Sequence, residues 1–137
     1  MGRLSVGGIS DRLGRKRSMA VAFSLCGLGL FALVGAGAVG TSAAFLCAVA
    51  VAAFFEGTQY TLFPSLVADY YGHAHSSTNY AVLYSAKMIG GVFGGTAVGW
   101  LVTATDWSVA FLVGGALAVG ASLGAIVLRP PGDAATD

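Results

Sequence analysis

The sequence predicts an all-α membrane protein with four transmembrane helices and the end of a fifth. Of its 137 residues, 56% are hydrophobic and only 9% are charged, whereas a soluble domain usually carries about 25% charged residues. The charge is unevenly placed, because most of the Lys and Arg residues fall within the first 17 positions and residues 18–55 carry no charge. Such a chain cannot cover a water-facing surface, so its long apolar runs are predicted to lie in lipid.

Four apolar segments are long enough to cross a bilayer, whose core of about 30 Å needs roughly 20 helical residues. They form one transmembrane region, 18–128, with helices expected at about 18–39, 43–67, 79–102 and 107–128. Before this region, residues 1–10 are interpreted as the end of another transmembrane helix and residues 11–17 as a basic loop. Residues 129–137 are interpreted as a tail.

The placement of Lys and Arg predicts the orientation of these helices. If the four spans alternate in direction, one side of the membrane receives five cations: Arg12, Arg15, Lys16, Arg17 and Arg129. The loops on the opposite side contain neither Lys nor Arg. We therefore expect a multi-pass protein of the cell membrane whose basic loop and C-terminus are cytoplasmic.

Glycines recur every four residues in the last two spans, at Gly91, Gly95 and Gly99 and again at Gly120 and Gly124. Small residues at this spacing let helix backbones approach closely in lipid. The pattern predicts a tight helix bundle and no particular chemistry.

The basic loop contains a spaced motif, G-x-x-x-D-R-x-G-R-K-R, whose fixed positions are Gly7, Asp11, Arg12, Gly14, Arg15, Lys16 and Arg17. An acidic residue ends one helix, a glycine permits a tight turn, and the basic cluster holds the loop at the cytoplasmic face. Asp11 can also pair with Arg15 or cap a neighbouring helix. The spacing resembles the loop signature of the major facilitator superfamily, which lies between helices 2 and 3 and recurs more weakly between helices 8 and 9.

Because twelve helices are the norm in that superfamily, the resemblance implies that this chain corresponds to the end of helix 8 and helices 9 to 12. Met1 then falls where helix 8 is already under way, so we expect a fragment that lacks the N-terminal half of the transporter. A small membrane module that is complete at 137 residues is the alternative.

Inserting a charged side chain into a transmembrane span costs roughly 2.5–3.5 kcal/mol of free energy, so such residues usually have a functional or structural role. Lys87 lies eight residues after Asn79, and Arg3 lies eight residues before Asp11, which places both about 12 Å from the cytoplasmic side. Two cations in one layer repel each other unless an anion lies between them. The pair is therefore predicted to form a carboxylate clamp.

Helical spacing adds polar side chains to the same layer. Tyr80 and Tyr84 share the face of Lys87. On the second span Gln59 reaches the depth of Lys87, with Tyr60 beside it and Glu56 one turn deeper. Glu56 is expected either to form a structural ion pair with Lys87 or to carry a proton during transport.

Several stretches are similar to the oxalate/formate antiporter family, namely 2–11, 62–65, 68–72, 79–80 and 84–87. Members of that family bind carboxylates through an Arg on helix 8 and a Lys on helix 11, which the resemblance maps to Arg3 and Lys87. Two positions depart from the pattern. Glu56 stands where a neutral residue is expected, and Met88 stands where glycine usually follows the lysine.

The sequence therefore predicts secondary transport of a small mono- or dicarboxylate, by antiport or proton symport. Arg3 and Lys87 would bind the anion, and Gln59, Tyr60, Tyr80 and Tyr84 would form the pocket walls. The alternatives are a major facilitator for drugs or sugars in which Lys87 is structural, or a module that does not transport. No enzyme activity, cofactor, metal site or nucleic-acid partner is expected, because no nucleophile–base pair or ligand cluster is evident.

Overall fold

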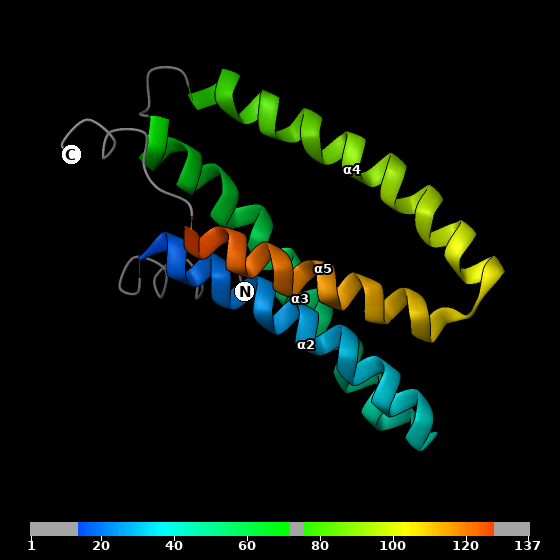
Figure 1. Ribbon diagram of the computed structural model, residues 1–137. Coiled ribbons are helices and arrows are strands. Elements are labelled where there is room, and N and C mark those ends of the chain that lie inside the picture. Colours follow the sequence, from blue (N-terminus) through cyan, green and yellow to red (C-terminus); the bar gives the residue numbers. More distant parts are fainter. Residues whose placement is uncertain (1–13, 72–75, 128–137) are drawn as a thin grey trace.

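The computed structural model describes residues 14–71 and 76–127 and contains four helices in these ranges (Figure 1). They are α2 (Arg15–Val39), α3 (Ser42–Tyr71), α4 (Ser76–Ala104) and α5 (Trp107–Val127). Each is long and apolar enough to span a membrane. The predicted all-α membrane fold is confirmed. The predicted helix end at 1–10, with Arg3 and Gly7, lies outside the described residues, as do Asp11, Arg12 and the tail.

Three of the described helices, α2, α3 and α4, begin earlier or end later than their apolar runs suggested, whereas α5 begins at the predicted residue. Arg15, Lys16 and Arg17 form the first turn of α2 and are not part of a loop. Gly14 precedes them with a φ of 84°, a conformation that glycine adopts at little cost, so the chain turns there and the helix starts at once. Long basic side chains are themselves good helix formers.

Helix α3 runs to Tyr71 although it contains Pro64. Proline has no N–H, so within the helix ladder the carbonyl of Tyr60, four residues earlier, loses its usual donor. Nearby, the hydroxyl of Ser65 donates to the carbonyl oxygen of Leu62 at 2.9 Å. The proline therefore lies inside a continuous helix, with its local backbone defect beside Tyr60.

Helix α2 packs extensively against both α3 and α5. Its backbone approaches these neighbours closely at glycines. A Cβ on Gly29 would lie 2.9 Å from the backbone nitrogen of Ala52, and a Cβ on Gly27 would lie 2.9 Å from the carbonyl oxygen of Gly115. A Cβ on Gly115 would in turn lie 2.6 Å from a ring carbon of Phe31. These glycines allow the close helix packing.

The two repeating glycine sets, from which a tight bundle was expected, do not supply these contacts among the described helices. At each of those positions, Gly91, Gly95, Gly99, Gly120 and Gly124, an added Cβ would meet no described atom within 4 Å. The spacing suited close packing, but these faces point away from the other described helices.

Polar contacts also join α2 to α5. The hydroxyl of buried Ser122 donates to the carbonyl oxygen of Ala20 at 2.8 Å. Because this uses the single proton of Ser122, the 2.8 Å bond between Ser24 and Ser122 has Ser24 as its donor.

At the start of α5, the Asp106 carboxylate accepts the backbone N–H of Ser108 at 2.6 Å and caps the helix.

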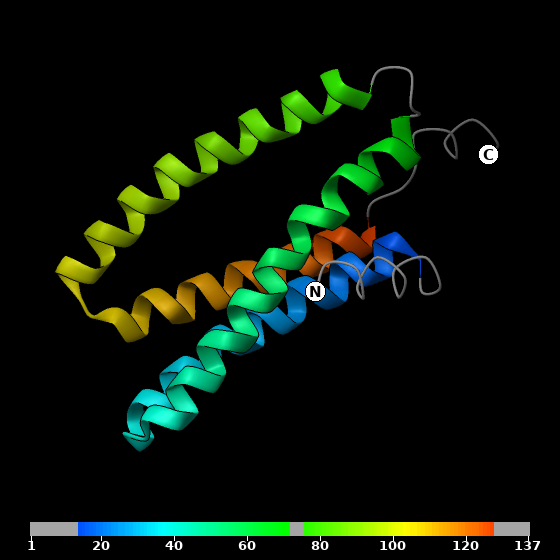
Figure 2. The same ribbon diagram turned by 180° about the vertical axis from the view of Figure 1, so that it is seen from behind.

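Helix α4 stands apart from the other three helices (Figures 1 and 2). It contacts α3 and α5 only sparsely. In the part of the chain that the structure describes, no residue of α4 is buried. This separation opens a cavity between α4 and the α2–α3 pair.

Candidate substrate pocket

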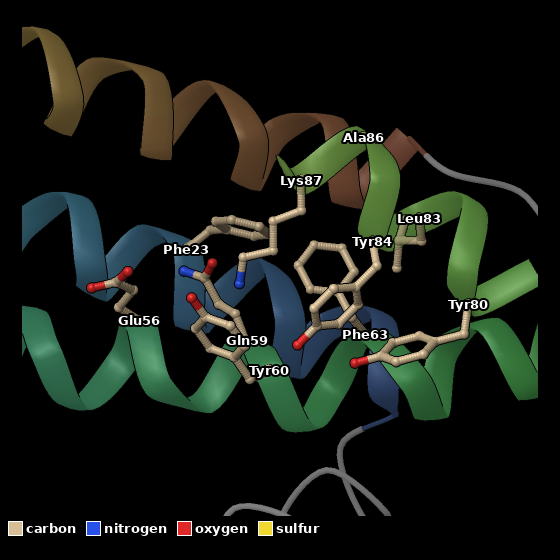
Figure 3. A pocket seen from close by; sticks show the side chains of 10 residues that line it. All are labelled: Phe23, Glu56, Gln59, Tyr60, Phe63, Tyr80, Leu83, Tyr84, Ala86 and Lys87. Atoms are coloured by element: carbon tan, nitrogen blue, oxygen red, sulfur yellow. The ribbon is translucent and has the colours of Figure 1, made fainter. Parts of the chain in front are cut away.

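A cavity of about 350 Å³ lies between α3 and the first half of α4, with α2 behind it (Figure 3). Its size falls in the range of small-molecule sites, about 300–1,000 Å³. Ten side chains line it: Phe23 from α2, then Glu56, Gln59, Tyr60 and Phe63 from α3, and Tyr80, Leu83, Tyr84, Ala86 and Lys87 from α4. A mostly apolar wall with a few polar groups is typical of a ligand pocket.

The same helical spacing selects the lining on both helices. The α3 residues fall at 56, 59, 60 and 63, and four of the α4 residues fall at 80, 83, 84 and 87. Both sets follow an i, i+3, i+4, i+7 pattern, which places each set on one face of its helix. Two such faces point at each other across the cavity, so the polar side chains converge there.

The close contact between Tyr60 and Lys87 follows from their equal depth in the bundle. Tyr60 lies eleven residues before the end of α3 at Tyr71, and Lys87 lies eleven residues after the start of α4 at Ser76. At 1.5 Å per residue, both reach a layer about 16 Å from that end of the helices. The Lys87 Nζ accordingly lies 2.9 Å from the centroid of the Tyr60 ring.

A second aromatic ring borders the same ammonium group. The centroid of the Tyr84 ring lies 5.8 Å from Lys87 Nζ. Tyr84 also packs edge-on against Tyr80, with 4.9 Å between the ring centroids. A cation over aromatic faces is stabilised by about 0.5–2 kcal/mol. That is less than the cost of a fully desolvated charge, so the ammonium group remains able to bind an anion.

The structure thus brings five of the predicted binding residues to one cavity: Gln59, Tyr60, Tyr80, Tyr84 and Lys87. Arg3, the predicted second cation, lies outside the described residues. Figure 3 shows Lys87 extending from α4 toward α3, with Glu56 at one end of the row of side chains and Tyr80 at the other.

Glu56 also lines the cavity, but it does not bind Lys87 directly. Among the described residues, no ion pair within 4.0 Å joins their charged atoms. Glu56 and Gln59 additionally line a second cavity of about 600 Å³ beside α2 and α5. The expected structural ion pair is therefore not formed, and the carboxylate lies between two cavities.

The sequence did not identify the apolar part of the lining. Phe63 and Leu83 could have been found, because they continue the helical spacing of the polar residues. Phe23 could not, because it comes from α2 and reaches the cavity through its edge-on contact with Phe63, at 6.1 Å between centroids. No spacing within one helix reports such a contact.

The basic motif forms a separate contact at the end of the bundle. Arg15 Nε lies 3.0 Å from Asp69 Oδ2, so the first turn of α2 is joined to the last turns of α3. The predicted pairing of Arg15 with Asp11 involves a residue outside the described ranges. In the sequence Asp69 falls within the family-like stretch 68–72, and its role as an ion-pair partner depends on helix packing.

Comparisons with known proteins agree with this architecture. The profile of the Major Facilitator Superfamily matches residues 1–137. The chain is 36% identical over 107 residues to the oxalate:formate antiporter of Oxalobacter formigenes, covering 78% of this chain and 25% of that protein. It is 34% identical over 91 residues to the uncharacterized MFS-type transporter YhjX of Escherichia coli (strain K12), covering 66% of this chain and 22% of that protein.

No solved structure matches the chain. The chain spans about a quarter of the length of the curated relatives it matches. The four apolar helices of the described ranges and the match along residues 1–137 lead to one assignment. The chain belongs to the Major Facilitator Superfamily and is similar to the oxalate:formate antiporter within it.

Proposed function

We propose that this chain forms part of a secondary transporter for a small carboxylate and supplies one wall of its substrate pocket. The observation that carries the proposal is the position of Lys87, whose ammonium group enters an aromatic cavity deep in the bundle. One relative of the chain is an oxalate:formate antiporter, which supports a carboxylate as the substrate class.

The energetics favour an anion at this position. A lysine at membrane depth costs roughly 2.5–3.5 kcal/mol on insertion scales, and the ring contact with Tyr60 offsets only part of that cost. A carboxylate would form a charge-assisted hydrogen bond with Lys87 Nζ, an interaction about twice as strong as a neutral one. Gln59 and the tyrosine hydroxyls are suited to fix its orientation.

Arg3 completes the proposed clamp from the helix end that precedes the basic motif. Its position eight residues before Asp11 supports a depth close to that of Lys87. In this proposal the carboxylate moves by antiport or by proton symport, with Glu56 as the candidate proton carrier. Transport would follow from rocking of one half of the transporter against the other, with the basic end of α2 on the cytoplasmic side.

The test replaces Lys87 by Gln within a transporter of full length. Residues 1–137 would be placed in the oxalate:formate antiporter in exchange for the matching segment, and uptake of labelled formate, oxalate and lactate would be measured in proteoliposomes. We expect Lys87→Gln to reduce uptake at least about a hundredfold, because the variant loses a charge-assisted bond in a low-dielectric site.

Lys16→Gln is the matched control, because it removes the same group from the first turn of α2, outside the cavity. Uptake by this variant should stay within about twofold of the parent, as for a surface charge. Equal uptake by the Lys87 variant and the parent would exclude the anion site. It would favour a facilitator of another substrate class, such as drugs or sugars, in which Lys87 is structural.

A further inference from the structure

We infer that Glu56 selects the substrate, so that the pocket binds short carboxylates that also carry a hydrogen-bond donor, a hydroxyl or an ammonium group, and discriminates against dicarboxylates. This inference rests on the proposed function, because it takes Lys87 as the group that binds the carboxylate. It concerns the opposite end of the same cavity.

The first support is the position of Glu56 along the cavity. It lies one helical turn from Tyr60 on the same face of α3, about 6 Å deeper along the helix axis. Because Tyr60 and Lys87 share a layer, the carboxylate of Glu56 lies about one turn beyond the ammonium group. A short ligand bound to Lys87 would therefore have its far end toward Glu56.

The second support is that Glu56 remains available to a ligand. No ion pair with Lys87 forms within 4.0 Å, and no hydrogen bond to its carboxylate occurs among the described residues. The side chain is exposed to the cavities that it lines. An ionised carboxylate accepts hydrogen bonds and donates none, so its natural partner is a donor on the ligand.

The third support is the charge at the Glu56 end of the cavity. Among the described lining residues Glu56 is the one anion, and it lies about one helical turn from the layer of Lys87. A dicarboxylate would place its second negative charge toward Glu56, and like charges repel strongly in a medium of low dielectric constant. A hydroxy- or amino-carboxylate matches both ends, with its carboxylate on Lys87 and its donor on Glu56.

The experiment measures binding to the full-length chimeric transporter described above, in lipid nanodiscs, by isothermal titration calorimetry. Four probes separate the chemistry: propionate with no donor, lactate with a hydroxyl, alanine with an ammonium group, and malonate with a second carboxylate. We expect lactate or alanine to bind at least about tenfold more tightly than malonate. Their donor gains a charge-assisted hydrogen bond to Glu56, and they avoid the repulsion between Glu56 and a second carboxylate.

Variants of Glu56 test whether this residue causes the preference over malonate. Glu56→Gln should reduce the preference over malonate to within about threefold, and the shorter Glu56→Asp, which keeps the charge, should retain most of it. Asp69→Asn is the matched control, because it removes a carboxylate from the same helix outside the cavity. It should leave the preference unchanged.

Two outcomes would overturn the inference while the proposed function stands. One is malonate binding as tightly as lactate and alanine while Lys87→Gln weakens all the probes. The other is Glu56→Gln weakening all four probes equally, which would give Glu56 only a structural role. If Lys87→Gln leaves every affinity unchanged, or no probe binds the parent chimera, the proposed function fails and the inference fails with it.

Discussion

The Lys87 Nζ lies 2.9 Å from the centroid of the Tyr60 ring, so the cation of α4 rests on an aromatic face of α3. This contact joins two helices that otherwise touch sparsely. It also holds the ammonium group within the cavity before any ligand arrives. The ring therefore has a role that differs from that of the Tyr60 hydroxyl.

Replacing Tyr60 by Leu should weaken carboxylate binding by about threefold to thirtyfold, because Lys87 loses a cation–π contact of about 0.5–2 kcal/mol that positions it. Tyr60→Phe keeps the ring and loses only the hydroxyl, so its loss of affinity should be clearly smaller than that of the Leu variant. Calorimetric titration of both variants with lactate measures the difference. Equal losses in the two variants would assign the effect to the hydroxyl and contradict a role for the ring.

The ion pair between Arg15 and Asp69 should contribute little to stability. Its side chains are 32% and 45% exposed, and pairs of this kind contribute about 0.2–1 kcal/mol. A double-mutant cycle with Arg15→Gln and Asp69→Asn, followed by unfolding in detergent, isolates this pair from other contacts of Arg15. We expect a coupling energy below about 1 kcal/mol that falls as salt is added. A coupling of several kcal/mol that resists salt would contradict this estimate.

Adding a methyl group should distinguish the packed glycines from the unpacked ones. Gly29→Ala places a Cβ 2.9 Å from a backbone nitrogen of α3, so the helices must shift, at a cost of about 1–3 kcal/mol. Gly95→Ala, the matched control on α4, meets no described atom within 4 Å. Thermal unfolding of the chain in detergent should show a lower midpoint for the Gly29 variant alone. The reverse order would mean that α4 packs more tightly than α2.

The hydroxyl of Ser122 should stabilise the α2–α5 pair. Ser122→Ala removes its bond to the Ala20 carbonyl and also the acceptor of Ser24. Interhelical bonds in membranes average about 0.6 kcal/mol with a maximum near 1.7. We expect a loss within that range for Ser122→Ala and a smaller loss for Ser24→Ala, measured by unfolding in detergent. A larger loss for Ser24→Ala would contradict the donor assignment.

The sequence predicted the helices and part of the pocket for a simple reason. Span length follows from apolar run length, and the depth of Lys87 and Gln59 follows from counting residues along two antiparallel helices. These quantities are local. They needed no knowledge of which helix lies beside which.

The close glycine contacts and the contribution of Phe23 were beyond that reasoning. In a membrane an apolar side chain is about equally stable against a lipid tail and against another helix. Hydrophobic periodicity therefore does not identify the face of a helix that points into the bundle. Gly29 and Gly95 therefore look alike in sequence, although only Gly29 meets a neighbouring backbone. The choice between them is made by helix packing.

The isolation of α4 has a mechanical consequence. This helix carries Lys87, Tyr84 and Tyr80, yet buries none of its residues against the other described helices. A small pivot of α4 as a rigid rod would widen or narrow the gap to α3 without breaking the glycine contacts of α2. Such a pivot would change the width of the pocket while α2, α3 and α5 keep their contacts with one another.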